Sequence, residues 1–472
     1  MDIKSFARGS GILIVSNVLL KAMNFFLMPL YTRYLSTEML GVSDTITSFT
    51  GVVFPILLMG LDSAFSAFYY DSDEKQSKKV FNTILITLLI IGFIPVFCCI
   101  FSPELSHVLL GSEDYSSVLV IALISITFNI WYMPFALNLR MQNKMLLYSI
   151  VNIISSFCMI ILNVLFVAIL KYGTCSLVLS TMIVQILQCC LFIYANKVGI
   201  NFEYFDWNLL KRMIKFAVPI VPGAIMSWVL AMSDRYILLH FQGAEAVGLY
   251  GVGTRIMTVL NIFISSVSLA YTTFAYGSKN NDDAKEKYIK VFDLLLLILL
   301  CMCFTVSSFA EEVVELMTAP SYHKSYVIVR DLLFAQLFYG ITTIVSYGIL
   351  FEKKSSYILM ANFLGAISNI ILNILLIPEY GISAAAATTC LGYLITFIVT
   401  FIFAQKCYHC SYNIRKAIIV LILTYITLIA DSNCLLLVRG GVWGVMLFVL
   451  LYLYRKTLFD FLSLFIRKRK KN

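Results

Sequence analysis

Long runs of apolar residues, separated by short polar stretches, follow one another along the whole chain. Each run has about twenty residues, enough for a helix to cross the roughly 30 Å hydrocarbon core of a bilayer with its backbone hydrogen bonds satisfied. The pattern therefore predicts an all-α integral membrane protein with about fourteen transmembrane helices. We place these spans at residues 9–34, 37–69, 80–101, 116–140, 145–170, 174–196, 213–240, 244–275, 287–310, 325–351, 355–378, 381–405, 413–431 and 434–455.

Composition and loop lengths narrow the class further. Of the 472 residues, 60% are hydrophobic and 13% are charged, whereas soluble domains have about 45–50% apolar and about 25% charged residues. No predicted loop exceeds about twenty residues, which is too short for a soluble catalytic domain. The first span follows Lys4 and Arg8 without a small-residue cleavage site, so we expect a retained helix and not a signal peptide.

The distribution of lysine and arginine predicts the orientation in the membrane. Most of the 35 basic residues lie at the two termini and in every second loop, whereas the other loops carry only Arg33, Lys171, Lys324 and Arg439. The positive-inside rule then places both termini of this multi-pass protein on the cytoplasmic side of the inner (cytoplasmic) membrane. The basic run at residues 467–471 suits anionic membrane lipids, so we expect no nucleic-acid binding.

Two stretches of the chain repeat each other. Residues 143–163 and 353–373 share a lysine, an asparagine and the run IILN at an offset of 210 residues, and both copies then reach a Tyr-Gly turn. TEMLG (37–41) and AEAVG (244–248) share Glu and Gly at an offset of 207. Because an even number of spans separates the copies, the two halves should have the same orientation, related by a pseudo-two-fold axis along the membrane normal.

The repeat predicts how the chain is divided. We expect an N-terminal lobe at residues 1–200, a C-terminal lobe at 201–410, and a terminal helix pair with a basic cytoplasmic tail at 411–472. Two parallel six-helix lobes are typical of a transporter whose central cavity opens alternately to each side of the membrane.

Polar residues inside the spans form helical stripes, which predict a polar lumen. Asn17, Lys21 and Asn24 are spaced i, i+4, i+7 on one face of the first span, with Lys21 near the middle of the membrane. The offset of 207 aligns Arg255 with Ser48, so Arg255 should point into the same cavity from the other lobe. The stripe on the second span consists of Asp44, Ser48, Gly51, Pro55 and Asp62.

Adjacent Asp and Arg residues occur twice within the spans, as Asp234-Arg235 in the seventh and Arg330-Asp331 in the tenth. A charge at the bilayer centre costs roughly 2.5–3.5 kcal/mol on insertion scales, so such residues usually mark a functional site. For Arg330 and Asp44, which lie near span ends, a structural ion pair or snorkelling to the interface is an equally open interpretation. Bends at which helices would flex are predicted at Pro29, Pro55, Pro219 and Pro222.

Two segments resemble a known family. GSGILIVSNVLLKAMNFFLMPLYTRYLSTEMLG (9–41) and FAVPIVPGAIMSWVLAMSDRYILLHFQGAEAVGLYGVGTRI (216–256) are similar to the polysaccharide repeat-unit flippases of the multidrug/oligosaccharidyl-lipid/polysaccharide (MOP) superfamily. Members share a Pro-rich start to the seventh helix, an Asp-Arg near its outer end, and a Glu-x-x-Gly-x-Tyr that opens the eighth. The resemblance implies a two-lobed fold like that of MATE transporters, with no cofactor and no use of ATP. The implied activity is export of a polyprenyl-diphosphate-linked oligosaccharide for surface polysaccharide biosynthesis.

Such a cargo carries a diphosphate that needs cationic partners within the membrane. Arginine suits phosphate because its planar fork donates paired hydrogen bonds and stays charged. Asp234 would orient Arg235, and Asp44 or Asp62 would bind a coupling ion, H⁺ or Na⁺, between which the sequence does not choose. Membrane lipids are further expected partners, and contacts with other polysaccharide-assembly proteins are left open. We expect the cationic part of the lumen to be lined by Lys21, Arg235, Arg255 and Arg330.

Two other classes of function remain open. An exporter of organic cations with the same fold would have an acidic, aromatic lumen, whereas here the bases within the spans at least match the acids. A polysaccharide polymerase or ligase usually carries catalytic groups on a large external loop, and the longest external segments, 102–115 and 311–324, are short. Cys407 and Cys410 lack a second pair for a zinc site, and no Walker, GxSxG or HExxH motif occurs. We therefore expect neither an enzyme nor a metal protein.

Overall fold

The described chain is helical throughout. The computed structural model describes residues 25–70, 74–142, 144–199, 201–279, 283–352, 354–431 and 436–459, and every regular element within these ranges is a helix. Nine of the helices in these ranges are long and apolar enough to cross a membrane. The all-α membrane fold predicted from the hydrophobic pattern is confirmed. Asn17, Lys21 and Asn24 lie outside the described residues.

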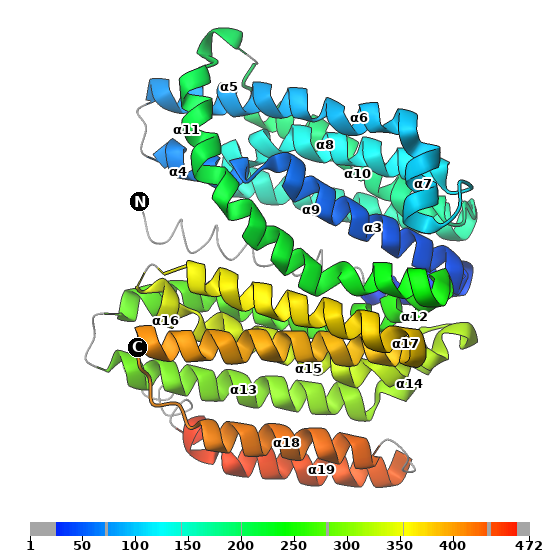
Figure 1. Cartoon of the computed structure of the whole chain (residues 1–472), viewed down its shortest axis with the longest axis vertical. Coiled ribbons are helices and arrows are strands. Elements are labelled where there is room, and N and C mark those ends of the chain that lie inside the picture. Colours follow the sequence, from blue (N-terminus) through cyan, green and yellow to red (C-terminus); the bar gives the residue numbers. More distant parts are fainter. Residues whose placement is uncertain are drawn as a thin grey trace. The chain divides into compact units, whose positions relative to one another are not determined.

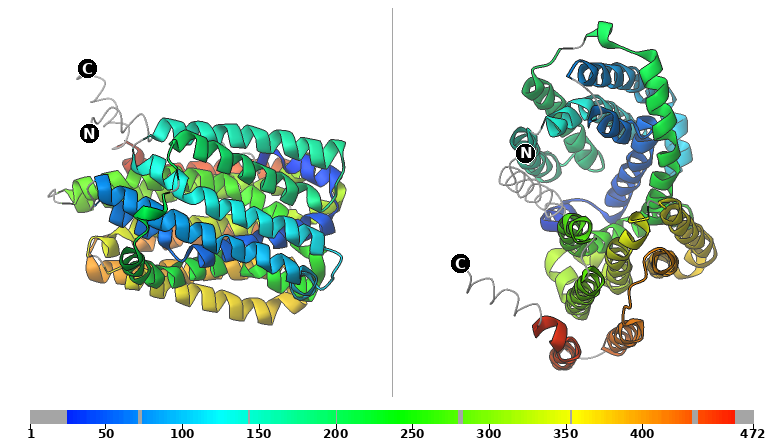
Figure 2. Two further views of the ribbon diagram at one scale, coloured as in Figure 1. Left: turned by 90° about the horizontal axis from the view of Figure 1, so that it is seen from above. Right: turned by 90° about the vertical axis from the view of Figure 1, so that its left-hand side faces the viewer.

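Two compact units make up the chain, and Figures 1 and 2 show that each is built from helices that run side by side. The first unit contains Met1–Val252 with Ile377–Gly381, and the second contains Gly253–Leu376 with Ile382–Asn472. The three-part division at residues 200 and 410 stays a prediction.

The first unit begins with α2 (Met28–Tyr34), α3 (Thr37–Leu58), α4 (Leu61–Tyr70), α5 (Glu74–Ile91), α6 (Phe93–Cys98), the 3₁₀ turn η1 (Cys99–Phe101) and α7 (Ser102–Leu110). It continues with α8 (Ser116–Met141), α9 (Met145–Asn163), the π-helical turn η2 (Val164–Ile169), α10 (Cys175–Asn196), the 3₁₀ turn η3 (Phe202–Tyr204), α11 (Trp207–Ala217) and the 3₁₀ turn η4 (Val218–Ile220). The long helix α12 (Val221–Ser278) passes from this unit into the second.

The second unit follows with α13 (Ala284–Ser308), α14 (Ala310–Met317), the 3₁₀ turn η5 (Pro320–Ser325), α15 (Tyr326–Val345), α16 (Tyr347–Leu350), α17 (Ser356–Cys407), α18 (Ile414–Asp431) and α19 (Leu436–Leu453). α12 and α17 are each far longer than the roughly 20 residues that cross a bilayer. Both are divided by a glycine with non-helical backbone angles, Gly243 in α12 and Gly381 in α17. Each therefore provides two predicted spans.

α8 in the first unit and α15 in the second occupy comparable positions along the chain. α8 contacts α3, α4, α5, α6, α9 and α10 in the first unit, and α15 contacts α13, α14 and α16 in the second. α8 begins at Ser116 and α15 at Tyr326, an offset of 210 residues, which equals the offset of the sequence repeat. Among the candidate spans of each unit these two have the largest buried share. The helices α8 and α15, which lie in the most buried candidate span of each unit, are therefore related by the offset of the repeat.

The glycines of the two Tyr-Gly turns have the same positive φ angle. Gly173 has φ of 57° and Gly381 has φ of 56°, a left-handed conformation that glycine adopts without steric cost. Gly243, between the two halves of α12, has φ of 81°. The Gln242 side chain beside it donates from Nε2 to the carbonyl oxygens of Ile377 and Pro378, each at 3.1 Å. The predicted Tyr-Gly turns are confirmed.

The second predicted span, at residues 37–69, is divided into two helices. α3 ends where Met59 and Gly60 adopt left-handed φ angles of 49° and 70°, and α4 starts immediately afterwards. A Cβ atom at Gly60 would lie 2.8 Å from the carbonyl oxygen of Ala217, so the end of α11 packs closely against this break. The stripe predicted along one continuous helix is therefore wrong at its end, because Asp62 lies on α4.

The four prolines predicted as bends occupy different positions. Pro29 lies in the first turn of α2, where a missing backbone N–H costs little. Pro55 lies inside α3, four residues before the break at Met59. Pro219 is in the 3₁₀ turn η4 and Pro222 is in the first turn of α12, so both lie at the junction between α11 and α12. Their role as hinges stays a prediction.

The two short segments that repeat at an offset of 207 contact each other within the first unit. A Cβ atom at Gly41 of α3 would overlap the carbonyl oxygen of Ala244, and a Cβ atom at Gly248 would overlap the carbonyl oxygen of Thr37. The contact is reciprocal, because Thr37 and Ala244 are themselves 207 residues apart. Only glycine lets two helix backbones approach this closely, as small residues do at many membrane helix interfaces.

The predicted orientation can be tested with reporter fusions, because each crossing inverts the side on which a fused domain emerges. If a C-terminal fusion reports the outside, one of the last two predicted helices does not cross the membrane. If any other fusion reports the side opposite to the expected one, the fourteen-span topology is wrong. We expect cytoplasmic activity from fusions after Lys79, Lys197, Lys290 and Lys470, and external activity from fusions near Ser112, Gly243 and Gly381.

Candidate functional site

Asp234 and Arg235 are buried on the first half of α12. Only 2% of the Asp234 surface and 8% of the Arg235 surface is exposed. Nη1 of Arg235 lies 4.0 Å from Oδ1 of Asp234, and the backbone N–H of Arg235 donates to the same oxygen at 2.9 Å. Because a buried charge is strongly unfavourable without a partner, this adjacency lowers the cost of holding both groups inside a membrane span.

Tyr250 completes this group from the other side of the turn at Gly243. Its side chain is fully buried, and its hydroxyl donates to Oδ2 of Asp234. The ring centroid lies 6.0 Å from the guanidinium carbon of Arg235, at the outer limit of a cation–π contact. Asp234 thus uses both carboxylate oxygens, one toward Arg235 and one toward Tyr250. We call Asp234, Arg235 and Tyr250 the Asp-Arg-Tyr cluster.

The polar stripe of α3 lies against this part of α12. The hydroxyl of Ser48 donates to Sδ of Met232 at 3.7 Å, and Nη1 of Arg235 donates to the same sulfur. One turn further along α3, a Cβ atom at Gly51 would lie 3.2 Å from Nε1 of Trp228. The structure therefore brings Ser48 and Gly51, two members of the predicted stripe, to the helix that carries the cluster.

Two aromatic side chains of α12, Trp228 and Tyr236, carry polar atoms that are buried. The rings of Trp228 and Tyr236 lie 5.9 Å apart between centroids. Nε1 of Trp228 and the hydroxyl of Tyr236 are buried, and within the described ranges neither has a hydrogen-bond partner. Such donors are energetically costly when they stay unsatisfied, so each is available to a polar ligand.

The other candidate residues lie elsewhere. Asp44 is half-buried on α3, one turn before Ser48, whose hydroxyl donates to the Asp44 carbonyl at 2.9 Å. Asp62 is half-buried in the first turn of α4, and Arg255 is half-buried on the part of α12 that belongs to the second unit. Asp62 and the stripe of α3 lie on different helices, because α3 ends at Leu58 and α4 begins at Leu61.

Arg330 belongs to a second group of the same composition, within the second unit. Its Nε donates to Oδ1 of Asp331 at 3.1 Å, and the hydroxyl of Tyr425 donates to the same oxygen at 2.8 Å. The guanidinium carbon lies 5.0 Å from the Tyr425 ring centroid. Tyr425 is on α18, so this group joins α15 to the terminal helix pair, as the structural interpretation of Arg330 requires. The predicted contact between Arg330 and the cargo stays a prediction.

The sequence analysis predicted no function for Tyr250 or Met232, although Tyr250 belongs to a residue pattern that it had identified. Tyr250 is the last residue of the Glu-x-x-Gly-x-Tyr segment, and Gly248 within that segment makes the close contact with Thr37. The two residue patterns that carry the family resemblance, Asp-Arg and Glu-x-x-Gly-x-Tyr, therefore meet at one place. Met232 lies one turn before Arg235 and has no comparable signal.

The helical repeat, the apolar spans and the buried charges describe an all-α membrane protein of two helical units. The structure is similar to that of lipid II flippase MurJ in an inward closed conformation, with a TM-score of 0.75, 19% identity, and coverage of 95% of this chain and 100% of that one. It is also similar to an inward-facing multidrug resistance MATE family transporter of the MOP superfamily. That match has a TM-score of 0.70, 15% identity, and coverage of 82% of this chain and 94% of that one. At these identities the likeness shows the fold alone.

The family described as "Polysaccharide biosynthesis protein" matches residues 30–327, well over half of the chain. This protein belongs to that family. It is also 27% identical over 234 residues to an uncharacterized membrane protein of Methanocaldococcus jannaschii, a match that covers 48% of this chain and 45% of that protein. The chain thus matches less than half the length of this curated relative. The predicted membership of a polysaccharide biosynthesis family is therefore confirmed, and so is the predicted MATE-like fold.

Proposed function

We propose that this protein is a flippase that moves a polyprenyl-diphosphate-linked oligosaccharide repeat unit across the cytoplasmic membrane by alternating access, for the synthesis of a surface polysaccharide. Membership of a polysaccharide biosynthesis family supports the sugar part of this cargo. The fold shared with a lipid II flippase supports a lipid-linked cargo. Both termini would lie in the cytoplasm, as the distribution of basic residues predicts.

The observation that carries the proposal is the buried guanidinium of Arg235. It sits in a membrane span, 8% exposed, beside a carboxylate that Tyr250 also holds. A diphosphate that crosses the hydrocarbon needs a cation that stays charged there, and an arginine provides one at every pH of interest. Asp234 keeps the site neutral when no cargo is bound. Lys21 and Arg255 would share the diphosphate with Arg235.

A cavity in the second unit suits the lipid part of the cargo. It has a volume of about 500 Å³, and every described residue of its lining is apolar, among them Phe292, Phe338, Phe397 and Ile418. Helices α13, α15, α17 and α18 contribute these residues. Burial of hydrocarbon in an apolar cavity costs no hydrogen bonds, so a stretch of an isoprenoid chain fits such a lining.

Transport by the purified full-length protein in liposomes tests the proposal. A fluorescent polyprenyl-diphosphate-linked oligosaccharide should become accessible to a membrane-impermeant glycosidase faster than in protein-free liposomes. The same sugar on a polyprenyl monophosphate should move more slowly, because one phosphate offers fewer oxygens to the cationic residues.

The competing function is export of organic cations by the same fold, which the likeness to a multidrug resistance transporter brings into consideration. A fluorescent organic cation therefore serves as the second cargo in the same liposomes, with imposed H⁺ or Na⁺ gradients. Movement of that cation without movement of the lipid-linked oligosaccharide would overturn the proposed function in favour of the exporter.

A further inference from the structure

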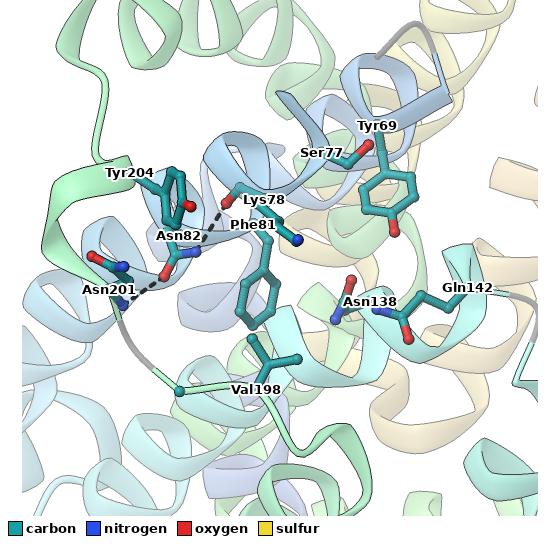
Figure 3. Close-up of a pocket in the computed structure, with 11 residues that line it drawn as sticks. Tyr69, Ser77, Lys78, Phe81, Asn82, Asn138, Gln142, Val198, Asn201 and Tyr204 are labelled. Carbon is teal, nitrogen blue, oxygen red and sulfur yellow. Dashed lines mark hydrogen bonds between the residues drawn. The ribbon is translucent and has the colours of Figure 1, made fainter. Parts of the chain in front are cut away.

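A second cavity lies in the first unit and shares no lining residue with the Asp-Arg-Tyr cluster. Its volume is about 700 Å³, within the range of about 300–1,000 Å³ that small-molecule sites occupy. It lies among the C-terminal ends of α4 and α8, the N-terminal part of α5 and the segment around η3 (Figure 3).

Carboxamides dominate the polar part of this lining. Each carboxamide offers two N–H donors and one carbonyl acceptor, so it pairs equally well with hydroxyl donors and hydroxyl acceptors. Figure 3 shows that the side chains of Gln142 and Asn138 face the same space as Tyr69 and Lys78. The four carboxamides are Asn82, Asn138, Gln142 and Asn201.

Aromatic rings and a single charge complete the lining. Tyr69, Phe81 and Tyr204 provide three ring systems, whose negative faces attract the weakly positive C–H bonds of a ligand. Among the described residues of the lining, Lys78 is the only charged one. The cavity thus combines flat apolar faces with neutral hydrogen-bonding groups.

The walls of the cavity are fixed by hydrogen bonds behind it. Nδ2 of Asn82 donates to the Lys78 carbonyl at 2.9 Å, and Oδ1 of Asn82 accepts from the backbone N–H of Asn201 at 2.9 Å. Nδ2 of Asn138 donates to Oδ1 of the buried Asn196 at 2.9 Å. A site held in place before its ligand arrives loses less entropy on binding than one that must be ordered.

From this lining we infer that the cavity binds a sugar residue. A purely apolar ligand would offer no hydrogen bond to the polar groups of the lining, among them the Gln142 carboxamide and the Tyr204 hydroxyl, and burial of such groups without partners is costly. A multiply charged anion would meet only Lys78, and a cation would meet Lys78 and no carboxylate among the described lining residues. A pyranose ring instead presents hydroxyls around its edge and C–H bonds on its faces, and so matches both parts of the lining.

The inference rests on the proposed function for its physiological ligand. Lys79 and Lys197 are next in sequence to the lining residues Lys78 and Val198, in two of the loops that the basic residues predict to be cytoplasmic. A sugar of the lipid-linked cargo would dock there before its diphosphate enters the membrane. The cavity is then a loading subsite that selects for the glycan, separate from the cationic residues that bind the diphosphate.

Binding of free sugars to the purified full-length protein tests the subsite without any transport measurement. The probes are a hexose, an N-acetylhexosamine and a uronic acid, observed by saturation-transfer NMR in detergent, with inorganic phosphate as a competitor. We expect signals from at least one sugar and no competition by phosphate. Val198→Trp, which fills the cavity from a half-buried lining position, should abolish the signals.

Two milder variants and a matched control define the site more closely. Gln142→Ala and Tyr204→Ala each remove one lining side chain and should weaken sugar binding by about five- to tenfold. Gln76→Ala removes an exposed glutamine next to the lining residue Ser77 and should change nothing. Sugar signals that persist in Val198→Trp, or that are absent from the wild-type protein, would overturn the inference.

The liposome assay separates this inference from the proposed function. In the variants we expect KM for the glycosylated lipid to rise about five- to tenfold with kcat unchanged, and movement of bare polyprenyl diphosphate to stay the same. If the wild-type protein moves the lipid-linked oligosaccharide and Gln142→Ala, Tyr204→Ala and Val198→Trp all move it with unchanged KM, the subsite is disproved and the flippase function stands. If the wild-type protein binds sugars in the cavity and moves no lipid-linked oligosaccharide, the flippase function fails and the sugar site stands.

Discussion

Arg235→Glu is expected to abolish export, whereas Arg235→Lys should retain part of it. Glutamate in place of Arg235 would stand beside Asp234 and repel both that carboxylate and the diphosphate of the cargo. Lysine keeps the charge but loses the planar fork that donates paired hydrogen bonds to phosphate, so we expect a loss of about tenfold or more in export rate. The measurement is complementation of a flippase-deficient strain, scored together with the abundance of the protein in the membrane.

A purely structural role for the pair predicts a different pattern. Each single change would then lower abundance, because it leaves a buried charge without its partner, and Asp234→Ala/Arg235→Ala together would restore both abundance and export. Export at the wild-type rate by this double variant would contradict diphosphate binding by Arg235. Lys211→Glu, a charge reversal at an exposed position of α11, is the control for the effect of net charge.

The group around Arg330 provides a matched comparison. It has the same three residue types, yet its tyrosine comes from α18 and joins that helix to α15. If Arg330 only joins these helices, Arg330→Lys should lower abundance or thermal stability and leave export per molecule unchanged. If Arg330 lines the path of the cargo, as its sequence position suggests, export per molecule should fall as it does for Arg235→Lys.

The hydrophobic pattern predicted the fold because the membrane leaves the backbone few choices. An apolar run of about twenty residues must form a helix to satisfy its N–H and C=O groups in lipid. Breaks within the runs depend on tertiary contacts, which no local pattern reveals. The break at Met59-Gly60 is an example, since Gly60 is needed where the Ala217 carbonyl approaches.

The candidate site was predictable only in part, for a similar reason. The energetic cost of charge in a membrane span singled out Asp234 and Arg235 from the sequence. Their tyrosine partner lies 16 residues away and reaches Asp234 because α12 turns at Gly243. The cavity in the first unit was not predicted at all, since Asn82, Asn138 and Asn201 lie on separate elements and share no sequence spacing.

Gly41→Ala and Gly248→Ala are each expected to destabilise the protein by roughly 1–3 kcal/mol, the usual cost of overpacking a well-packed contact. The atoms that a new Cβ would meet are the backbone carbonyl oxygens of Ala244 and Thr37, so no side chain can move aside and the two helices must separate. Thermal unfolding of the purified protein in detergent, together with export in the complementation assay, measures the effect.

The reciprocity of this contact makes the prediction sharper. Both substitutions push apart the same two helix segments, so the double variant should lose about as much stability as either single variant, and not the sum. Gly277→Ala is the control, because this glycine is on α12 as well and has no other group within 4 Å of a Cβ atom there. Alanine at Gly277 should be neutral, or stabilising by up to about 1 kcal/mol through its higher helix propensity. If Gly41→Ala and Gly248→Ala behave like this control, or if their effects simply add, the two repeated segments do not contact each other in the folded protein.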